Sequence, residues 1–106
     1  GLAGAAFAQP PAAAAPAPRR LPPYTNPVYA GSMPDPGVMR HRGVYYAFGT
    51  TGGDRKADGR VFTLLRSRDL VRWEELGGAL TPPNDDARLQ YWAPEAAAGD
   101  DGRFYL

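Results

Sequence analysis

One carboxylate in this 106-residue chain has a setting that suits chemistry. Asp35 lies between Pro34 and Pro36. Because the residue before a proline is biased toward extended backbone, residues 33–36 are predicted to form a stiff, extended segment with fixed side-chain directions. A carboxylate that is held in one direction is useful in catalysis, but an aspartate at the start of a strand can also simply make an Asx turn. Both interpretations of Asp35 are open at this point.

The residues after Asp35 predict a β-hairpin. Residues 37–40 and 44–48 are rich in β-branched and aromatic side chains, and residues 41–43 supply a short turn that ends in a glycine. Further strands are predicted at residues 61–67 and 71–76, the last with Trp73 buried. Four short strands with tight connections form an antiparallel meander, which is the unit of one propeller blade.

The hairpin pattern returns near the end of the chain. Pro94 corresponds to Pro36 and Gly102 corresponds to Gly43, with one additional residue in the second turn. Residues 93–98 and 103–106 are then the second pair of strands. A recurring hairpin is typical of a blade-by-blade β architecture. In this register position 93 is equivalent to position 35, so we expect Asp35 and residues 92–93 to lie at equivalent places where a site would form.

Composition narrows the possible partners. The formal net charge is +1, from 12 basic and 11 acidic residues, so no nucleic acid or anionic membrane is expected as a partner. The chain has no cysteine and no apolar run near the length of a membrane span. His41 is predicted to lie in a solvated turn, and the aspartates of the polar loops lack the spacing of a calcium loop. The glycine-rich residues 49–59 lack the G-K-S/T ending of a phosphate loop and are predicted to be a solvated loop.

Residues 1–23 differ from the rest of the chain. They are rich in alanine and proline, and Ala6, Phe7 and Ala8 before Gln9 have the A-x-A form of a signal-peptidase site. We interpret residues 1–23 as the tail of a secretory signal followed by a semi-rigid linker, and residues 24–106 as part of a larger domain. The alternative is a disordered arm without an export role.

Four segments together resemble the N-terminal part of glycoside hydrolase family 43. They are M-P-D-P-G-V at residues 33–38, Y-Y-A-F-G-T at residues 45–50, S-R-D-L-V-R-W-E at residues 67–74 and Y-W-A-P-E at residues 91–95. Their order and spacing carry the resemblance, which covers residues 24–106. That family has a five-bladed β-propeller. The resemblance therefore implies an all-β fold, with residues 24–106 forming blade one and the start of blade two of a longer protein.

The resemblance also implies roles for two residues. Asp35 matches the family's general base, which activates water in an inverting reaction. Such a base lies roughly 6.5–9.5 Å from a carboxylic acid, so that water fits between them. Trp92 matches a tryptophan that lines the sugar subsite, although a large aromatic is ordinarily a core residue. The family's acid and its pKa-setting aspartate belong to later blades. Glu95 does not match that acid, so residues 24–106 alone are not expected to be an active enzyme.

Three functions are therefore considered. The first is a secreted or periplasmic glycosidase that cleaves arabinose- or xylose-containing plant polysaccharides or oligosaccharides with inversion, without a cofactor; an axial calcium ion in the complete propeller is left open. The second is a retaining fructan-type hydrolase with Asp35 as nucleophile. Those enzymes favour N-D-P-N, whereas Pro34 and Gly37 flank Asp35 and Pro36 here. The third is a non-catalytic carbohydrate-binding propeller.

The A-x-A pattern predicts the site of export cleavage. In a secreting host, the precursor should be cut after Ala8, because small residues at positions 6 and 8 fit the signal peptidase. N-terminal sequencing of the exported protein tests this. Exported protein that still carries residues 2–8 would show that the alanine-rich start is not a signal.

Overall fold

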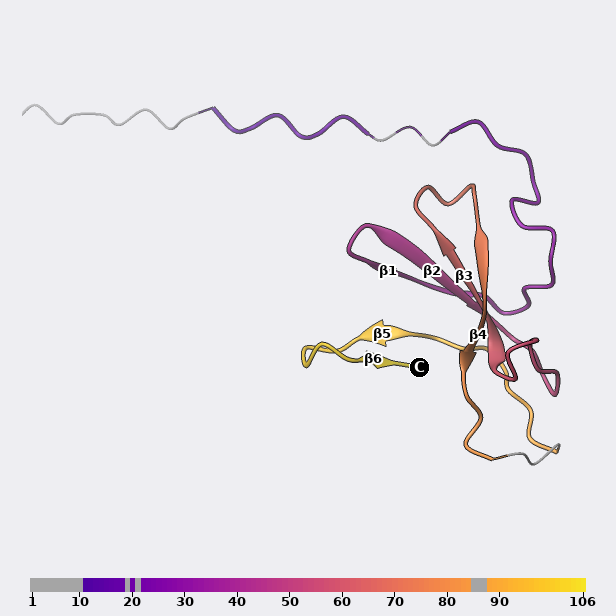
Figure 1. Cartoon of the computed structure of the whole chain (residues 1–106). Coiled ribbons are helices and arrows are strands. Elements are labelled where there is room, and N and C mark those ends of the chain that lie inside the picture. The colour runs from indigo at the N-terminus through magenta and orange to yellow at the C-terminus, as the bar shows by residue number, and fades with distance from the viewer. Residues whose placement is uncertain (1–10, 19, 21, 85–87) are drawn as a thin grey trace, which may run out of the picture.

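The computed structural model of this chain describes residues 11–18, 20, 22–84 and 88–106. Residues 11–18 contain no helix or strand and are exposed, and Figure 1 shows them as an arm that runs away from the folded part. The predicted cleavage motif at residues 6–8 lies outside the described residues. Within the described ranges, no helix has the length and hydropathy of a membrane span.

The folded part is built on a four-stranded antiparallel sheet (Figure 1). Neighbours in sequence are neighbours in the sheet, and each pair is antiparallel. The first three strands begin at the residues predicted from the sequence, so the all-β meander is confirmed. Its strands are β1 (Gly37–His41), β2 (Val44–Gly49), β3 (Val61–Ser67) and β4 (Glu74–Leu80).

The core lies along the two middle strands, β2 and β3. Its buried apolar side chains are Ala47, Phe48, Val61, Phe62 and Leu65. Because both strands have a partner on each edge, their backbone donors and acceptors are paired inside the sheet. The two middle strands are thus the best-packed part of the sheet, and they fix where the segments at its ends begin.

The strand β4 begins later than predicted and contains a β-bulge. Leu64 pairs with Gly77, and Leu65 pairs with Glu75, so Leu76 is an extra residue on β4. A bulge needs a locally altered backbone, and Gly77 provides it with a φ of 94°. The sequence contains the glycine, but the position of a bulge depends on tertiary pairing.

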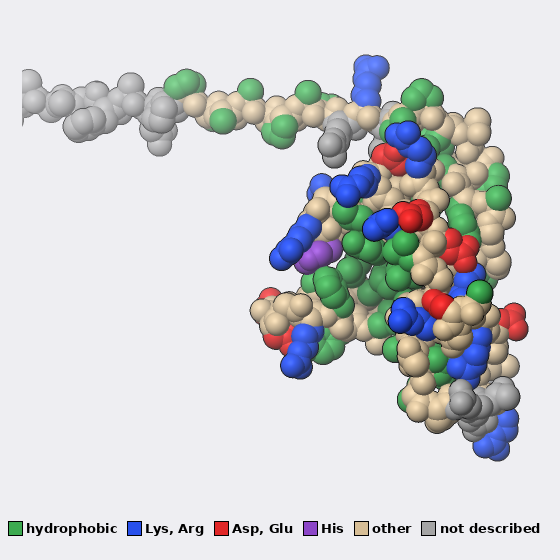
Figure 2. All heavy atoms as spheres, viewed as in Figure 1, with side chains coloured by type: hydrophobic (Ala, Val, Ile, Leu, Met, Phe, Trp, Pro, Cys, Tyr) green, Lys and Arg blue, Asp and Glu red, His purple; other side chains and the backbone are tan. Residues whose placement is uncertain are grey.

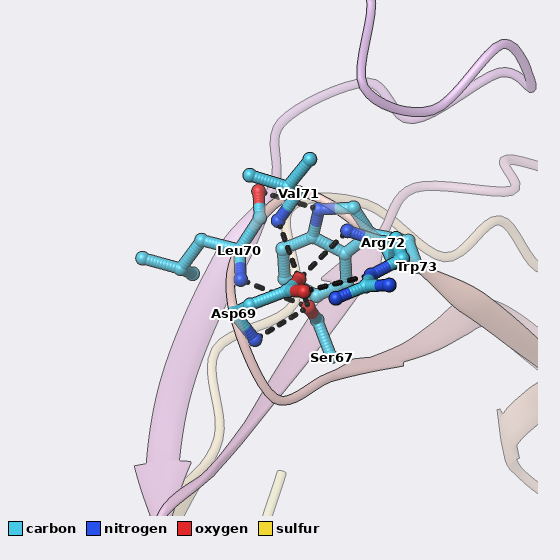
Figure 3. Close-up of polar contacts among 6 residues, drawn as sticks. All are labelled: Ser67, Asp69, Leu70, Val71, Arg72 and Trp73. Atoms are coloured by element: carbon cyan, nitrogen blue, oxygen red, sulfur yellow. Dashed lines mark hydrogen bonds and ion pairs between the residues drawn. The ribbon is translucent and has the colours of Figure 1, made fainter. Parts of the chain in front are cut away.

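A compact turn takes the place of the predicted start of the fourth strand (Figure 3). The Ser67 hydroxyl accepts the backbone N–H groups of Asp69 (3.2 Å) and Leu70 (2.9 Å). The Asp69 carboxylate accepts the backbone N–H groups of Val71 (3.0 Å) and Arg72 (2.8 Å), and the Arg72 guanidinium at 2.9 Å. These side chains supply hydrogen bonds that a strand would have taken from its neighbour, so the strand starts only after the turn.

Trp73 closes this turn instead of entering the core. Its indole N–H donates to the Leu70 carbonyl oxygen at 3.1 Å, and the side chain is half-buried. The prediction that Trp73 is buried was therefore wrong. The reason is that a turn carbonyl satisfies the indole N–H near the surface. Part of the S-R-D-L-V-R-W-E segment at residues 67–74 is thus a structural turn motif.

A second, smaller hairpin follows, with β5 (Ala97–Ala98) paired antiparallel to β6 (Phe104–Tyr105). The predicted strands at residues 93–98 and 103–106 are shorter in the structure. The predicted repeat is nevertheless visible in the backbone. Asp35 and Ala93 have φ values of 47° and 44°, and Gly43 and Gly102 have 79° and 78°. Equivalent positions in the two hairpins therefore share their unusual conformations.

The same values correct the prediction of an extended segment around Asp35. A following proline disfavours the right-handed helical region, and Asp35 takes the left-handed region, not the extended one. Aspartate tolerates this region better than most residues. This conformation is accompanied by a hydrogen bond between the Asp35 carboxylate and Thr50, the residue after β2, which the sequence alone does not show.

An apolar groove of about 450 Å³ lies between the sheet and the second hairpin. Figure 2 shows hydrophobic side chains in this hollow, next to the single histidine. His41 is the last residue of β1 and is half-buried, so its prediction as a solvated turn residue was wrong. Its ring packs edge-to-face on Phe104 with centroids 4.9 Å apart, because the second hairpin folds back toward the end of β1.

The Asp69 turn makes stability depend on pH. Hydrogen bonds from the Arg72 N–H, the Val71 N–H and the Arg72 guanidinium hold the Asp69 pKa well below its ordinary value of 3.8. A lowered folded-state pKa stabilises the fold above that ordinary value, and this contribution is lost as the pH falls below it. In the complete protein that carries this chain, Asp69→Asn should lower the melting temperature at pH 7.

The difference in melting temperature between wild type and Asp69→Asn should shrink as the pH falls from 4 toward 2, and thermal unfolding at several pH values measures it. Asp100→Asn is the control, since it removes the same charge from an exposed residue. Equal effects of the two variants at every pH would contradict a special role of the Asp69 turn.

Candidate functional site

Asp35 lies two residues before β1, at the end of the sheet where β2 finishes. Gly37 pairs with Phe48, so the residues before β1 lie beside those that follow β2. The first of these is Thr50, and its hydroxyl donates to the Asp35 carboxylate at 3.0 Å. Among the described residues, this is the hydrogen bond that the Asp35 carboxylate accepts. Asp35 is itself exposed to solvent. A carboxylate with one fixed oxygen and access to solvent can bind a water molecule or a ligand hydroxyl.

Thr50 joins this segment to the second repeat. Its side chain is buried, with 7% of the residue exposed. Its backbone N–H donates to the Pro34 carbonyl oxygen at 3.0 Å, and its hydroxyl oxygen accepts the Ala93 N–H at 2.7 Å. One residue thus holds position 35 and the equivalent position 93 together. The sequence predicted that these positions are equivalent in the repeat; their direct link through Thr50 is a finding of the structure.

Trp92 lies directly before Ala93 and is 61% exposed. Its neighbour Tyr91 forms an antiparallel bridge with Gly52, with backbone hydrogen bonds of 3.0 and 2.9 Å. The indole ring lies above Gly52, where a Cβ would be 3.6 Å from its nearest carbon. A Cβ there would meet the ring only at ordinary contact distance, and it is the positive φ of Gly52, 61°, that favours glycine at this position. In this chain Trp92 offers aromatic surface to solvent and does not fill the core.

Tyr91, the residue before Trp92, packs on the sheet. Its ring packs edge-to-face on Phe62, with centroids 5.8 Å apart. Its hydroxyl is buried and has no hydrogen-bond partner among the described residues. Tyr91 and Thr50 were not singled out from the sequence. The hairpin register could have pointed to Thr50, because it is the first residue after β2 and lies opposite the segment that contains Asp35.

The segment around Pro94 packs directly against the start of β1. Pro94 is buried, and a Cβ added to Gly37 would collide with its carbonyl oxygen. Glu95 follows on the surface and is exposed. The two equivalent segments of the repeat, residues 35–37 and 93–95, are therefore in van der Waals contact. This contact brings Asp35 and Trp92 to one end of the sheet.

The glycine-rich loop at residues 49–59 carries a separate cluster. Glu75 of β4 accepts the Tyr29 hydroxyl at 2.7 Å and pairs with the Lys56 ammonium at 2.5 Å. The ammonium, followed by the Tyr29 hydroxyl, holds the Glu75 pKa below its ordinary value, and the hydrogen bond to Glu75 raises the Tyr29 pKa. This cluster ties residue 29 and the loop to the sheet, and its role is structural.

Metal binding has no support in the described ranges. No group of three or more His, Cys, Asp or Glu side chains gathers there in a way that could hold a metal ion. Asp85 and Asp86, which were predicted to be loop residues, lie outside the described residues.

Comparisons with known proteins identify relatives of this chain. A sequence model described as glycosyl hydrolases family 43 matches residues 24–106, which confirms the resemblance drawn from the four motifs. The 1,2-beta-oligomannan phosphorylase of Thermoanaerobacter sp. (strain X514) is 39% identical over 57 residues. The aligned part is 54% of this chain and 19% of that protein, so the chain spans about a fifth of the length of this relative. No solved structure gives a significant match.

The contact between Gly37 and Pro94 can be tested by adding one methyl group. In the complete protein, Gly37→Ala should destabilise the fold by about 1–3 kcal/mol, because the new Cβ would press on a backbone oxygen that has no free space. Urea unfolding measures the change. Gly53→Ala is the control, since a Cβ there meets no atom within 4 Å. Equal unfolding midpoints for the two variants would show that the two repeats do not pack as described.

Proposed function

We propose that this chain, which belongs to glycosyl hydrolase family 43, supplies one catalytic carboxylate and one sugar-binding aromatic residue to an enzyme that cleaves glycosidic bonds. In this proposal Asp35 acts at the reacting centre and Trp92 binds a sugar ring. Residues 24–106 form blade one and the start of blade two of a five-bladed β-propeller. The observation that carries the proposal is the pair of hydrogen bonds through which Thr50 joins Asp35 to Ala93, the residue after Trp92.

The chemistry of Asp35 follows from inversion. As general base, its carboxylate takes a proton from water, the water oxygen bonds to the anomeric carbon, and the glycosidic C–O bond breaks. A carboxylic acid on the opposite side of the sugar protonates the leaving oxygen, roughly 6.5–9.5 Å away. We propose that this acid comes from another blade. Glu95 is not the candidate, because its position directly after W-A-P does not match the acid of the family and aligns with Gly37 in the repeat.

Trp92 suits the binding of a neutral ligand. An exposed indole face stacks on the C–H groups of a pyranose or furanose ring, and this contact needs no charge on the ligand. The exposure of Trp92 and the small residue beneath it, Gly52, support this role. We propose an arabinose- or xylose-containing oligosaccharide or polysaccharide as the substrate, and a secreted or periplasmic location from the A-x-A motif.

A second candidate is phosphorolysis, which the name of the relative favours. There, inorganic phosphate replaces water, forms the bond to the anomeric carbon and releases a sugar 1-phosphate. Phosphate is already an anion, so it needs no base, and a nearby carboxylate would repel it. In that case Asp35 would serve the leaving oxygen as a proton donor.

The substitution Asp35→Asn tests the proposal in the complete protein. It keeps the shape of the side chain and removes its ability to exchange a proton. Because general acid–base catalysis is commonly worth roughly 10²–10⁴-fold, kcat should fall by that factor while KM changes little. Asp100→Asn is the charge-matched control and should leave kcat unchanged. An unchanged kcat in Asp35→Asn would return Asp35 to the role of a turn residue.

Proton NMR of the first-formed product separates the alternatives. An inverted anomer in phosphate-free buffer supports the hydrolase with Asp35 as base, and a sugar 1-phosphate that forms only with phosphate supports the phosphorylase. A retained anomer makes Asp35 a nucleophile of the fructan-type mechanism. Oligosaccharide binding without any product would identify a non-catalytic propeller.

A further inference from the structure

We propose that Thr50 is a positioning residue of this site. Its hydroxyl sets the direction of the Asp35 carboxylate through the hydrogen bond that it donates to it. This inference rests on the proposed role of Asp35. Nothing in the four sequence motifs identifies Thr50, which is simply the last letter of one of them.

The Thr50 hydroxyl can make only a few hydrogen bonds. Threonine has one O–H donor and two acceptor lone pairs. The Ala93 N–H, at 2.7 Å, occupies an acceptor position of the Thr50 oxygen. The O–H proton is then free to point at the Asp35 carboxylate oxygen, 3.0 Å away. The contact with Ala93 therefore orients the hydroxyl, and the hydroxyl orients Asp35.

Thr50 holds the Asp35 segment at two points. Its backbone N–H binds the Pro34 carbonyl oxygen at 3.0 Å, while its side chain binds the Asp35 carboxylate. Asp35 has a φ of 47°, a region that most residues avoid and that a surrounding structure must maintain. The two contacts from Thr50 provide that constraint on both the backbone and the side chain.

The side chain of Thr50 is also stiff. Thr50 is buried, and its β-branched side chain has few χ1 rotamers. The hydrogen bond from this hydroxyl to Asp35 is partly buried, with the buried end at Thr50. Asp35 is itself exposed, so without Thr50 its carboxylate could turn among several directions. The proposed arrangement is an exposed reactive group held by a buried, rigid neighbour.

The experiment is a double-mutant cycle in the complete protein. Thr50→Val keeps the shape and removes the hydroxyl, so kcat should fall on the order of 10- to 100-fold, the cost of a misdirected catalytic group, with KM little changed. Thr50→Ser keeps the hydroxyl and should recover most of the activity. In the Asp35→Asn background, Thr50→Val should cause no further loss, because Thr50 acts through Asp35.

The control is the adjacent threonine. The Thr51 hydroxyl accepts the Phe62 N–H at 3.1 Å and has no contact with Asp35 among the described residues. Thr51→Val therefore loses a comparable hydrogen bond and should leave kcat near that of the wild type. If Thr50→Val does not fold, Thr50→Cys offers a weaker donor in a similar volume and should give an intermediate loss of kcat.

The outcomes separate this inference from the proposed function. Losses from Thr50→Val and Asp35→Asn that multiply in the double variant, or a Thr50→Ser variant as slow as Thr50→Val, would overturn the positioning role while Asp35 remains catalytic. An Asp35→Asn variant with unchanged kcat would overturn the function itself.

Discussion

The hydroxyl of Thr50 is the point on which the arrangement of this chain depends. It accepts the Ala93 N–H and donates to the Asp35 carboxylate, so two segments that are far apart in sequence meet at one buried oxygen atom. A buried polar group is costly unless it is paired, and these two hydrogen bonds pair the buried Thr50 hydroxyl as both donor and acceptor. The Tyr91–Gly52 bridge and the contact of Pro94 with Gly37 then surround the same point.

Local pattern was sufficient to predict some parts of the fold and insufficient for others. The three strands β1 to β3 follow from their β-branched and aromatic residues and the turn between them, and the equivalence of Asp35 with Ala93 followed from the spacing of prolines and glycines. The start of β4 was predicted too early, because hydrogen bonds to the Asp69 side chain compete with strand pairing. The left-handed backbone conformation of Asp35 was not predicted, because it accompanies a tertiary contact with Thr50. Of the candidate site, the sequence identified Asp35 and Trp92 by resemblance. Thr50 could be identified only once it was known which residues the hairpin places opposite each other.

The site fits two related reactions. Family membership indicates glycosidic-bond chemistry, while the matched relative is named as a phosphorylase and shares 57 aligned residues with this chain. Both reactions need a directed carboxylate and a surface that binds a sugar ring, which are the roles that we propose for Asp35 and Trp92. They differ in the nucleophile, so the groups that face Asp35 across the sugar determine which reaction occurs.

The most direct test of this account is a crystal structure of the complete protein with the substitution Asp35→Asn and an unhydrolysed oligosaccharide. We expect a sugar ring stacked on Trp92, with the side chain of residue 35 still bonded to the Thr50 hydroxyl and facing the anomeric centre. A sugar bound elsewhere, with Trp92 covered by the rest of the protein, would contradict the assignment of this site.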